Sequence, residues 1–465
     1  SGVIDGLCIQ GENFQALNLL QERFREKVDC VYIDPPYNTE SNSILYKNNF
    51  KHSSWLSMMH DRLRMDTHLT SEEAVHIVAI DEHEQERLGL LLETVFSGRK
   101  KTCVTIIHNP GGTQSGNFKR SNEYAYFVYP DRSGAVGVKE RENEDEWDVR
   151  PLRDVSKGNH LREDAKNCFY SILVKDSEVV GFGEVSDDNF HPPSANVKRS
   201  DGILEVYPID ARGNERKWTF ARQTVESIKD ELGVEYNSRR DIYDIIRTKK
   251  KFNPKTTWTS KKYNSNTHGS RLLNNIQGAN QFDFPKSLYN VIDCISVATK
   301  NESGTLTFDY FGGSGTTGHA VIAMNRGRKY PGADRRYVLA EMGDHFDEVM
   351  LPRLKKVAFS SEWKDGVPQS NDGMSHVIQY HRLESYEDAL NNIKVEKPDT
   401  ELDLLDAFDD YALHYMLPTE TRTSETLLAP DAFEQPFRYT LRLQHGMKSP
   451  TAHAVDLEST FNYLI

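Results

Sequence analysis

The chain has 465 residues, of which 37% are hydrophobic and 27% charged, and its formal net charge is −13. This apolar content supplies sizeable hydrophobic cores and excludes a wholly disordered chain. The apolar runs, such as 75–80, fall far short of the roughly 20 residues of a membrane-spanning helix. The first residues also lack the pattern of a signal peptide. We therefore expect a soluble, cytoplasmic protein of about three domains.

Up to about residue 130, helical and strand-like patterns alternate. Apolar residues at helical spacing and short β-rich runs predict these elements. In chain order they are a helix over 14–24, a strand over 28–33, a helix over 55–69, a strand over 74–80, a helix over 85–96 and a strand over 102–108. Such repeated alternation predicts a parallel sheet, of which 1–130 forms the first half.

The pattern changes after Pro130, where an acidic run leads into short strand-like pieces separated by turns. We interpret 131–275 as a separate domain inserted into the sheet. The α/β pattern then returns over 276–362, with a helix over 286–299, a strand over 306–308, a glycine-rich turn over 311–318, a helix ending near 326 and a strand over 337–341. Residues 363–465 are acidic and irregular, and we expect them to form a small C-terminal module.

The glycine-rich turn lies between a predicted strand and a predicted helix. Backbone N–H groups at a helix N-terminus bind anionic or nucleoside-bearing ligands, and glycine lets the backbone approach them closely. Gly313, Gly315 and Gly318 satisfy the dinucleotide fingerprint, and Glu341 ends the next strand, where a carboxylate can accept hydrogen bonds from ribose. The turn alone does not separate an NAD site from an S-adenosylmethionine site or from a turn without ligand. A Walker A loop is excluded, because no Lys-Ser/Thr pair follows the glycines.

Asp34-Pro35-Pro36-Tyr37 leaves the strand predicted over 28–33. The two prolines stiffen the turn, so that the Asp34 carboxylate and the Pro35 carbonyl become two fixed acceptors. Two acceptors can hold an exocyclic amino group with its lone pair free to attack. Tyr37 would stack on the base, which an enzyme acting on duplex DNA must first flip out. The alternative interpretation is a strand end with a rigid turn.

Together, these motifs resemble the β class of amino-group DNA methyltransferases, in which the DPPY motif precedes the cofactor motif and a target-recognition region separates the two. The resemblance implies a Rossmann-like methyltransferase domain with circularly permuted motif order, and catalytic roles for Asp34, Pro35, Pro36 and Tyr37. Its cofactor would be S-adenosylmethionine, and the residues implied to bind it are Glu12, Asn13, Phe284, Lys286, Ser287, Asp309, Phe311, Gly313, Ser314, Gly315, Thr316, Thr317 and Glu341. Glu12 stands where the family usually has the shorter Asp.

More narrowly, 32–39, Asn122-Glu123-Tyr124 and 456–464 are similar to the modification subunits of type III restriction-modification systems. That similarity implies methylation of adenine N6 in double-stranded DNA, a restriction subunit as partner and a homodimer. The 456–464 stretch normally continues in these proteins, so we expect the chain to be truncated. The alternatives are a cytosine-N4 methyltransferase, a DNA-recognition subunit with little turnover and, from another class, an NAD-binding oxidoreductase.

One basic segment lies on this acidic chain, with a net charge of +8 between Arg239 and Arg271. Phe252, Trp258 and Tyr263 are interleaved with its charges, which suits DNA contact near the catalytic pocket better than a solvated face. A polar loop after the strand at 102–108 carries further positive charge. The predicted DNA contacts are Lys119, Arg120, Arg247, Lys249, Lys250, Lys251, Lys255, Lys261 and Lys262.

The five cysteines form no CxxC pair, which argues against a disulfide scaffold and against a cysteine-rich zinc site. The histidines show no metal-ligand spacing, so no metal is predicted. No cysteine follows a proline, which argues against cytosine C5 methylation, because that reaction needs a cysteine nucleophile.

Overall fold

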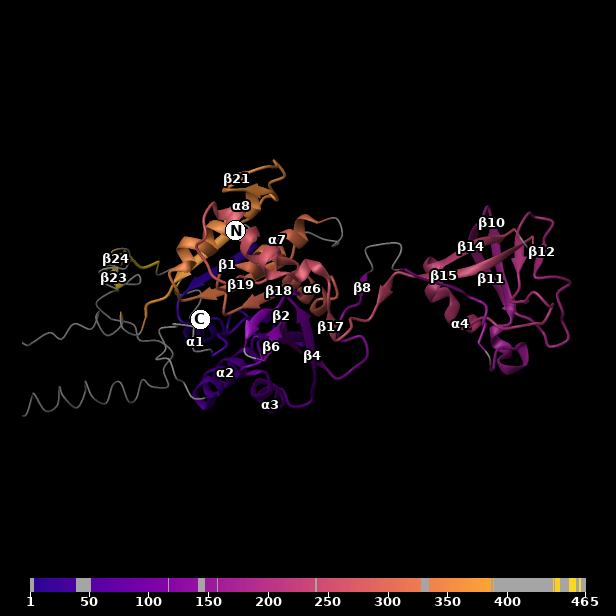
Figure 1. Ribbon diagram of the computed structural model, residues 1–465, viewed down its shortest axis with the longest axis horizontal. Coiled ribbons are helices and arrows are strands. Elements are labelled where there is room, and N and C mark those ends of the chain that lie inside the picture. The colour runs from indigo at the N-terminus through magenta and orange to yellow at the C-terminus, as the bar shows by residue number, and fades with distance from the viewer. Residues whose placement is uncertain are drawn as a thin grey trace, which may run out of the picture. The chain divides into compact units, whose positions relative to one another are not determined.

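The computed structural model describes residues 4–38, 52–115, 117–140, 147–156, 158–238, 241–327, 334–385, 440–443 and 451–456, with the single positions 388, 438 and 460. These residues form two compact units (Figure 1). One unit runs from Val138 to Pro254, and the other comprises the described residues on either side of it. No helix among the described residues is both long and apolar enough to cross a membrane.

The larger unit is built on a sheet with the strand order β17-β4-β7-β3-β2-β18-β19-β1-β22. These strands are β1 (Gly6–Gln10), β2 (Val28–Ile33), β3 (Thr70–Ile80), β4 (Arg99–Ile107), β7 (Asn122–Pro130), β17 (Thr257–Trp258), β18 (Leu306–Asp309), β19 (Arg336–Glu341) and β22 (Ile378–Arg382). β7 pairs antiparallel with both β3 and β4, and the other neighbours pair in parallel. The predicted parallel sheet is therefore confirmed except at β7, which pairs antiparallel. The segment from β4 to β7 is a loop and a short hairpin, and it contains no crossover helix that would return the chain in parallel.

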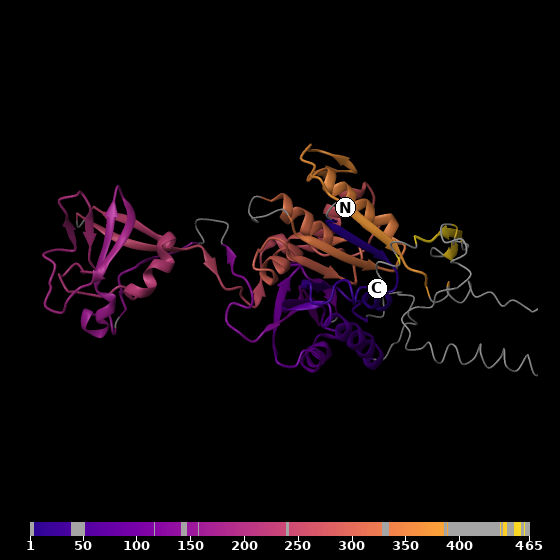
Figure 2. The same cartoon turned by 180° about the vertical axis from the view of Figure 1, so that it is seen from behind.

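Helices cover both faces of this sheet (Figures 1 and 2). One face carries α1 (Asn13–Leu19), α2 (His52–Asp66) and α3 (Gln85–Val95), and the other carries α6 (Leu288–Ala298), α7 (Thr316–Arg326) and α8 (Leu351–Phe359). Because strand side chains alternate between faces, Cys30 and Tyr32 of β2 enter one core, and Val31 and Ile33 enter the other. β2 is therefore apolar on both faces.

Most predicted elements agree with the structure to within a few residues at each end, but α1 does not. It ends at Leu19, well before the predicted end at 24, because the chain turns through 20–27 to enter β2. Glu26 takes a positive φ of 54° within that turn. Leu20 and Phe24, which continued the predicted helical spacing, therefore lie in a turn and pack on the core.

The chain after α8 returns to the main sheet. A hairpin of β20 (Trp363–Lys364) and β21 (Val367–Pro368) comes first, and β22 then pairs in parallel with β1. Residues 378–382, which we grouped with a C-terminal module, thus extend the main sheet. Farther along, β23 (Thr440–Leu443) pairs with β24 (Thr451–Ala454), whereas most of the 456–464 stretch lies outside the described residues.

The inserted unit has its own core, in which Trp218 and Tyr170 are among the buried residues. Two of its sheets have the strand orders β11-β10-β13-β12 and β14-β15-β9. Their strands are β9 (Asp148–Pro151), β10 (Tyr170–Lys175), β11 (Glu178–Val185), β12 (Asn196–Lys198), β13 (Leu204–Val206), β14 (Leu232–Asn237) and β15 (Ile242–Lys249). The shorter elements of the chain are β5 (Thr113–Ser115), β6 (Phe118–Arg120), β8 (Lys139–Glu140), β16 (Lys251–Phe252), α4 (Arg222–Val225) and α5 (Arg271–Gln277).

The sequence analysis placed 255–275 with the insertion, but the structure places these residues in the larger unit. β17 extends the main sheet, and Trp258 and Tyr263 are 4% and 3% exposed in the core beneath it. The Tyr263 hydroxyl donates a hydrogen bond to Asp293 Oδ2 (2.5 Å). The two aromatic rings of this basic segment therefore pack in the core of the larger unit.

Candidate active site

The site lies at one edge of the main sheet, where β2, β18, β19 and β1 end side by side. Asp34 follows β2, the glycine-rich turn follows β18, Glu341 ends β19, and Glu12 comes shortly after β1. The carboxyl ends of parallel strands share an edge, and open α/β sheets bind their ligands there. The structure thus brings together the predicted catalytic residues and most of the predicted cofactor residues.

Two hydrogen bonds hold the Asp34–Tyr37 turn in place. Trp55 Nε1 donates to the Pro36 carbonyl (2.7 Å), and the Tyr37 hydroxyl donates to Asp34 Oδ1 (2.7 Å). Among the described residues, no hydrogen bond reaches Asp34 Oδ2 or the Pro35 carbonyl. These two acceptors are therefore available to a ligand.

Lys286 reaches the same site from the segment before α6. Its ammonium lies 3.3 Å from Asp34 Oδ1, donates to the Tyr37 hydroxyl and donates to Glu123 Oε2 (2.5 Å). Glu123 lies on β7, and its other oxygen accepts a hydrogen bond from Asn290 Nδ2 (3.3 Å). The resemblance assigned Lys286 to the cofactor, whereas the structure places it against the predicted catalytic residues.

Burial governs the ionisation of this cluster. It raises the pKa of Asp34 above its ordinary value, and the nearby Lys286 opposes that shift. Burial and the Asp34 carboxylate together raise the pKa of Tyr37 well above its ordinary value. The Tyr37 hydroxyl therefore keeps its proton at neutral pH and serves as a donor to Asp34.

Asp309 ties the glycine-rich turn together. Its Oδ1 accepts the backbone N–H of Phe311 (3.0 Å), and its Oδ2 accepts the Thr317 hydroxyl (2.5 Å). Burial raises the pKa of Asp309 to about 7. Gly315 has a φ of 76° and directly precedes α7, a conformation that glycine adopts without strain. The turn thus presents its backbone at the N-terminus of an eleven-residue helix.

Glu341 is fixed against this turn by two backbone donors. Its Oε2 accepts the N–H of Gly313 (2.7 Å), and its Oε1 accepts the N–H of Gly343 (2.7 Å). The residue is only partly buried. Since a carboxylate oxygen has more than one acceptor position, Glu341 can still accept hydroxyl hydrogen bonds from a ligand.

Glu12 and Asn13 lie in a network that connects three elements. Glu12 Oε2 accepts the N–H of Phe14 (2.7 Å) at the start of α1, and Glu12 Oε1 accepts a hydrogen bond from Arg62 of α2 (2.5 Å). Asn13 also accepts from Arg62, and its Nδ2 donates to the Tyr310 carbonyl (3.0 Å). Sequence reasoning missed Arg62, because a single arginine in an amphipathic helix carries no signal of its own.

Arg353 of α8 is a second residue that the sequence did not reveal. It is fully buried, and its guanidinium donates to the Ser314 hydroxyl (3.0 Å) and to the Thr316 hydroxyl (2.9 Å). Loss of solvation lowers its pKa to about 9. Arg353 therefore supports the glycine-rich turn through these two hydroxyls.

The other two predicted cofactor residues differ sharply in exposure. Phe284 is 90% exposed and takes a positive φ of 57°. Ser287 is buried, and its hydroxyl donates to the Lys262 carbonyl (2.7 Å). Ser287 thus fixes the start of α6, while Phe284 projects from the segment that also carries Lys286.

Residues 28–349, about two thirds of the chain, match the sequence profile of the DNA methylase family of N6 and N4 methyltransferases. The chain belongs to the DNA methylase family. The predicted catalytic turn and the predicted cofactor turn of this methylase both lie within the matched residues, whereas Glu12 and Asn13 precede them.

The relatives of this methylase include subunits of restriction-modification enzymes. It is 26% identical over 372 residues to the Mod subunit of the type III enzyme EcoPI from Escherichia phage P1, covering 69% of this chain and 55% of the relative. It is also 26% identical over 352 residues to the type II methyltransferase M.KpnI from Klebsiella pneumoniae, covering 71% and 79%. The chain spans about half the length of the type III relatives that it matches. A solved structure, the cytosine-N4-specific PvuII DNA methyltransferase, is 11% identical with a TM-score of 0.38, over 75% of this chain and 86% of that chain.

The predicted DNA contacts of the methylase are divided between its two units at Pro254. Arg247 pairs with Glu231 (2.6 Å), Lys262 pairs with Asp293 (3.1 Å), and Arg120 pairs with Glu82. Lys250 lies over the ring of Trp147, 4.1 Å from its centroid. Of the predicted DNA contacts, five lysines are exposed and form no ion pair with another described residue, namely Lys119, Lys249, Lys251, Lys255 and Lys261.

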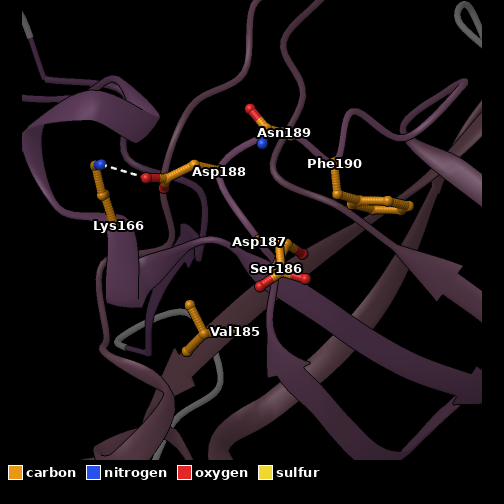
Figure 3. Close-up of a pocket in the computed structure, with 7 residues that line it drawn as sticks. All are labelled: Lys166, Val185, Ser186, Asp187, Asp188, Asn189 and Phe190. Carbon is orange, nitrogen blue, oxygen red and sulfur yellow. Dashed lines mark hydrogen bonds and ion pairs between the residues drawn. The ribbon is translucent and has the colours of Figure 1, made fainter.

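The inserted unit contains a hollow that the sequence did not predict (Figure 3). Lys166, Val185 and 186–190 line it, and Lys166 Nζ lies 2.5 Å from Asp188 Oδ2. The buried Arg162 stabilises the loop 186–190, because its guanidinium donates to the carbonyls of Asp187 and Phe190 (both 2.6 Å). None of the predicted site residues lies in this hollow.

One group of side chains among the described residues has the spacing of metal ligands, namely Asp81, Glu82 and His83 after β3. Side chains of this group already form hydrogen bonds or ion pairs within the protein. The ring of His83 contacts Asp81 Oδ2 (2.7 Å), and Arg120 pairs with Glu82. The absence of a metal site stays a prediction.

Replacing Gly315 with alanine is expected to destabilise the protein by about 1–3 kcal/mol. Gly315 has a positive φ, and a Cβ there would lie 2.8 Å from Met350 Cγ. Urea unfolding of the variant measures the loss. Gly111→Ala is the control, because its Cβ would meet only Asn109 Oδ1 at 3.7 Å. Equal stability of the two variants would show that the turn relaxes without cost.

Proposed function

We propose that this chain is an S-adenosylmethionine-dependent DNA methyltransferase that modifies the N6 amino group of adenine in duplex DNA. The observation that carries the proposal is the Asp34–Tyr37 turn, which offers two open acceptors at the sheet edge where the glycine-rich turn and Glu341 also lie. An amino group has two N–H bonds, and Asp34 Oδ2 with the Pro35 carbonyl matches them. The other parts of the site would place the methyl donor at the same edge.

The cofactor site is assigned by the donors and acceptors around the glycine-rich turn. The backbone of that turn, with Glu341 fixed by Gly313 and Gly343, would hold the nucleoside and its ribose hydroxyls. When bound, S-adenosylmethionine supplies an activated methyl group on a sulfonium. Asp34, Pro35 and Tyr37 then hold the target amine in line with that group, so most of the rate gain comes from positioning.

The adenine assignment rests on Asp34 in the first position of the motif and on the type III Mod subunits among the relatives. Cytosine N4 is the alternative within the same chemistry, and the PvuII enzyme is described as acting there. An NAD-dependent oxidoreductase would leave the two acceptors of the Asp34–Tyr37 turn without a role. A recognition subunit with little turnover would keep the same site but would label no DNA.

We assign DNA recognition to the inserted unit, because it has its own core and lies in the chain between the catalytic and cofactor turns. The exposed lysines of both units would contact phosphates, which carry most of the affinity of such complexes. Since several relatives are Mod subunits of type III enzymes, we also propose a restriction subunit as partner, a homodimer and a cytoplasmic location.

Transfer of a labelled methyl group from S-adenosylmethionine to mixed-sequence duplex DNA tests this function, with digestion to nucleosides to identify the product. We expect labelled N6-methyladenine. Labelled N4-methylcytosine would move the assignment to the alternative base. Binding of the cofactor without any labelled DNA would support the recognition subunit, and binding of NAD but not of S-adenosylmethionine would refute the proposal.

A further inference from the structure

Glu123 is a buried carboxylate with no role in the function proposed above. It lies near the start of β7, in a strand that is otherwise rich in aromatic and aliphatic residues. Its side chain is 9% exposed, and its two oxygens accept hydrogen bonds from Lys286 (2.5 Å) and Asn290 (3.3 Å). A buried charge costs free energy unless it is paired, so its position beside the catalytic turn requires an explanation.

The partner of Glu123 is also nearly buried and contacts the catalytic turn. The Lys286 side chain is 11% exposed, and its ammonium lies 3.3 Å from Asp34 Oδ1 and 4.7 Å from the centroid of the Tyr37 ring. An ammonium has three N–H donors. In this site they face Glu123 Oε2, the Tyr37 hydroxyl and Asp34 Oδ1.

The contacts of Asp34 are confined to one of its two oxygens. Oδ1 accepts from Tyr37 and faces Lys286, while Oδ2 has no hydrogen-bond partner among the described residues. A carboxylate held through one oxygen cannot rotate freely, so the direction of the other oxygen is set. That direction matters, because the target amine must meet Oδ2 and the Pro35 carbonyl at the same time.

We propose that Glu123 and Lys286 form a positioning pair for the catalytic turn. Glu123 holds the Lys286 ammonium, and this ammonium, together with the Tyr37 hydroxyl, fixes Asp34 Oδ1 and keeps Asp34 anionic with Oδ2 directed to the amine. The proposal rests on the methyl transfer proposed above. It also gives Lys286 a different role from the one implied by the resemblance, which was to contact the cofactor.

The electrostatic effects of the two residues on Asp34 have opposite signs. Lys286 lowers the pKa of Asp34 and Glu123 raises it, against a background of burial that raises it. The other titratable groups that interact with this cluster are Tyr37, Tyr32, Asp309 and His108. Removing Lys286 should therefore raise the pKa of Asp34, and neutralising Glu123 should lower it.

The test is the pH dependence of single-turnover methyl transfer in Lys286→Met, Lys286→Arg and Glu123→Gln. Transfer requires ionised Asp34, so the rate falls as the pH drops through its pKa. In Lys286→Met we expect this acid limb to move up by about one to three pH units, with a plateau rate lower by about tenfold. In Glu123→Gln it should move down, and in Lys286→Arg it should stay in place because the charge is retained.

The affinity for the cofactor and the pH profile together separate this role from the alternatives. The dissociation constant for S-adenosylmethionine should be nearly unchanged in all three variants. A large rise of this constant without a shift of the acid limb would show that Lys286 binds the cofactor, and would overturn the proposal. A general loss of rate with no pH shift in any variant would indicate a merely structural pair and would also overturn it.

Matched controls come from an ion pair near the amino-terminal end of β4, away from the site. Lys100 lies 2.6 Å from Asp131, and both side chains are 58% exposed. Lys100→Met and Asp131→Asn should leave the pH profile unchanged. Should the wild-type chain transfer no methyl group, the pKa of Asp34 is read directly by carboxyl NMR of ¹³C-aspartate-labelled protein, with Asp34→Asn for assignment. Opposite shifts in Lys286→Met and Glu123→Gln would then uphold the pair while the proposed function fails, and equal values would reject the pair.

Discussion

Replacing Asp34 with alanine is expected to lower the rate of methyl transfer by a factor on the order of 10³. The substitution removes the open Oδ2 acceptor and the oxygen that receives the Tyr37 hydroxyl. Without that anion, the target amine loses one of its two acceptors, and the Lys286 ammonium loses one of its carboxylate neighbours. Single-turnover transfer of labelled methyl to DNA measures the change.

The same variant should bind S-adenosylmethionine nearly as well as the wild type, because Asp34 lies at the end of β2 and, among the described residues, forms no hydrogen bond or ion pair with the glycine-rich turn. Asp61→Ala is the matched control, since Asp61 is an exposed acid on α2 whose contact is with neighbouring His60. A variant that loses cofactor affinity and rate together would show that Asp34 serves the cofactor site. Full activity of Asp34→Ala would remove this residue from the catalytic site.

Replacing Glu341 with alanine is expected to weaken binding of S-adenosylmethionine by about 10- to 100-fold, since hydrogen bonds to a charged group contribute about 1.5–3 kcal/mol. The carboxylate is oriented by the N–H groups of Gly313 and Gly343, and the side chain is partly exposed, so its oxygens can accept further hydrogen bonds from a ligand. Isothermal titration of the cofactor into the protein measures the loss.

Asp344→Ala provides the control for Glu341→Ala, because Asp344 is an exposed acid in the next turn of chain. Its affinity for the cofactor should equal that of the wild type. If Glu341→Ala instead lowers the melting temperature and leaves the affinity for the cofactor unchanged, the role of Glu341 is structural: it connects the loop at Gly343 to the glycine-rich turn through its two hydrogen bonds. The ribose contact would then have to be sought elsewhere at this edge of the sheet.

Local pattern was sufficient for the parts of the site that lie within one strand and its turn. The apolar run at 28–33 predicted β2, and the run of prolines after it predicted a rigid exit. The strand predicted over 306–308 and the helix ending near 326 are β18 and α7, with the glycines between them. These predictions depend on residues a few positions apart, whose preferences for strand, turn or helix agree with the tertiary structure.

The pairing of distant segments was beyond local pattern. β7 enters the sheet antiparallel, and nothing in 122–130 alone specifies its direction or its neighbours. The same holds for Trp258 and Tyr263, whose basic surroundings suggested a DNA-facing segment. Their burial follows from β17, which joins the sheet edge beside β4 and leaves both rings beneath it.

By itself, the sequence determined which chemistry this chain carries: a rigid Asp34 turn, a glycine-rich turn and an acidic strand end, arranged in an order that resembles one class of methyltransferase. Only the tertiary structure decided how these parts are supported. Lys286 meets Glu123 and Asp34, and Arg353 meets Ser314, across long separations in the chain. Such contacts form because parallel strands end at one edge and because buried charges must find partners wherever the fold places them.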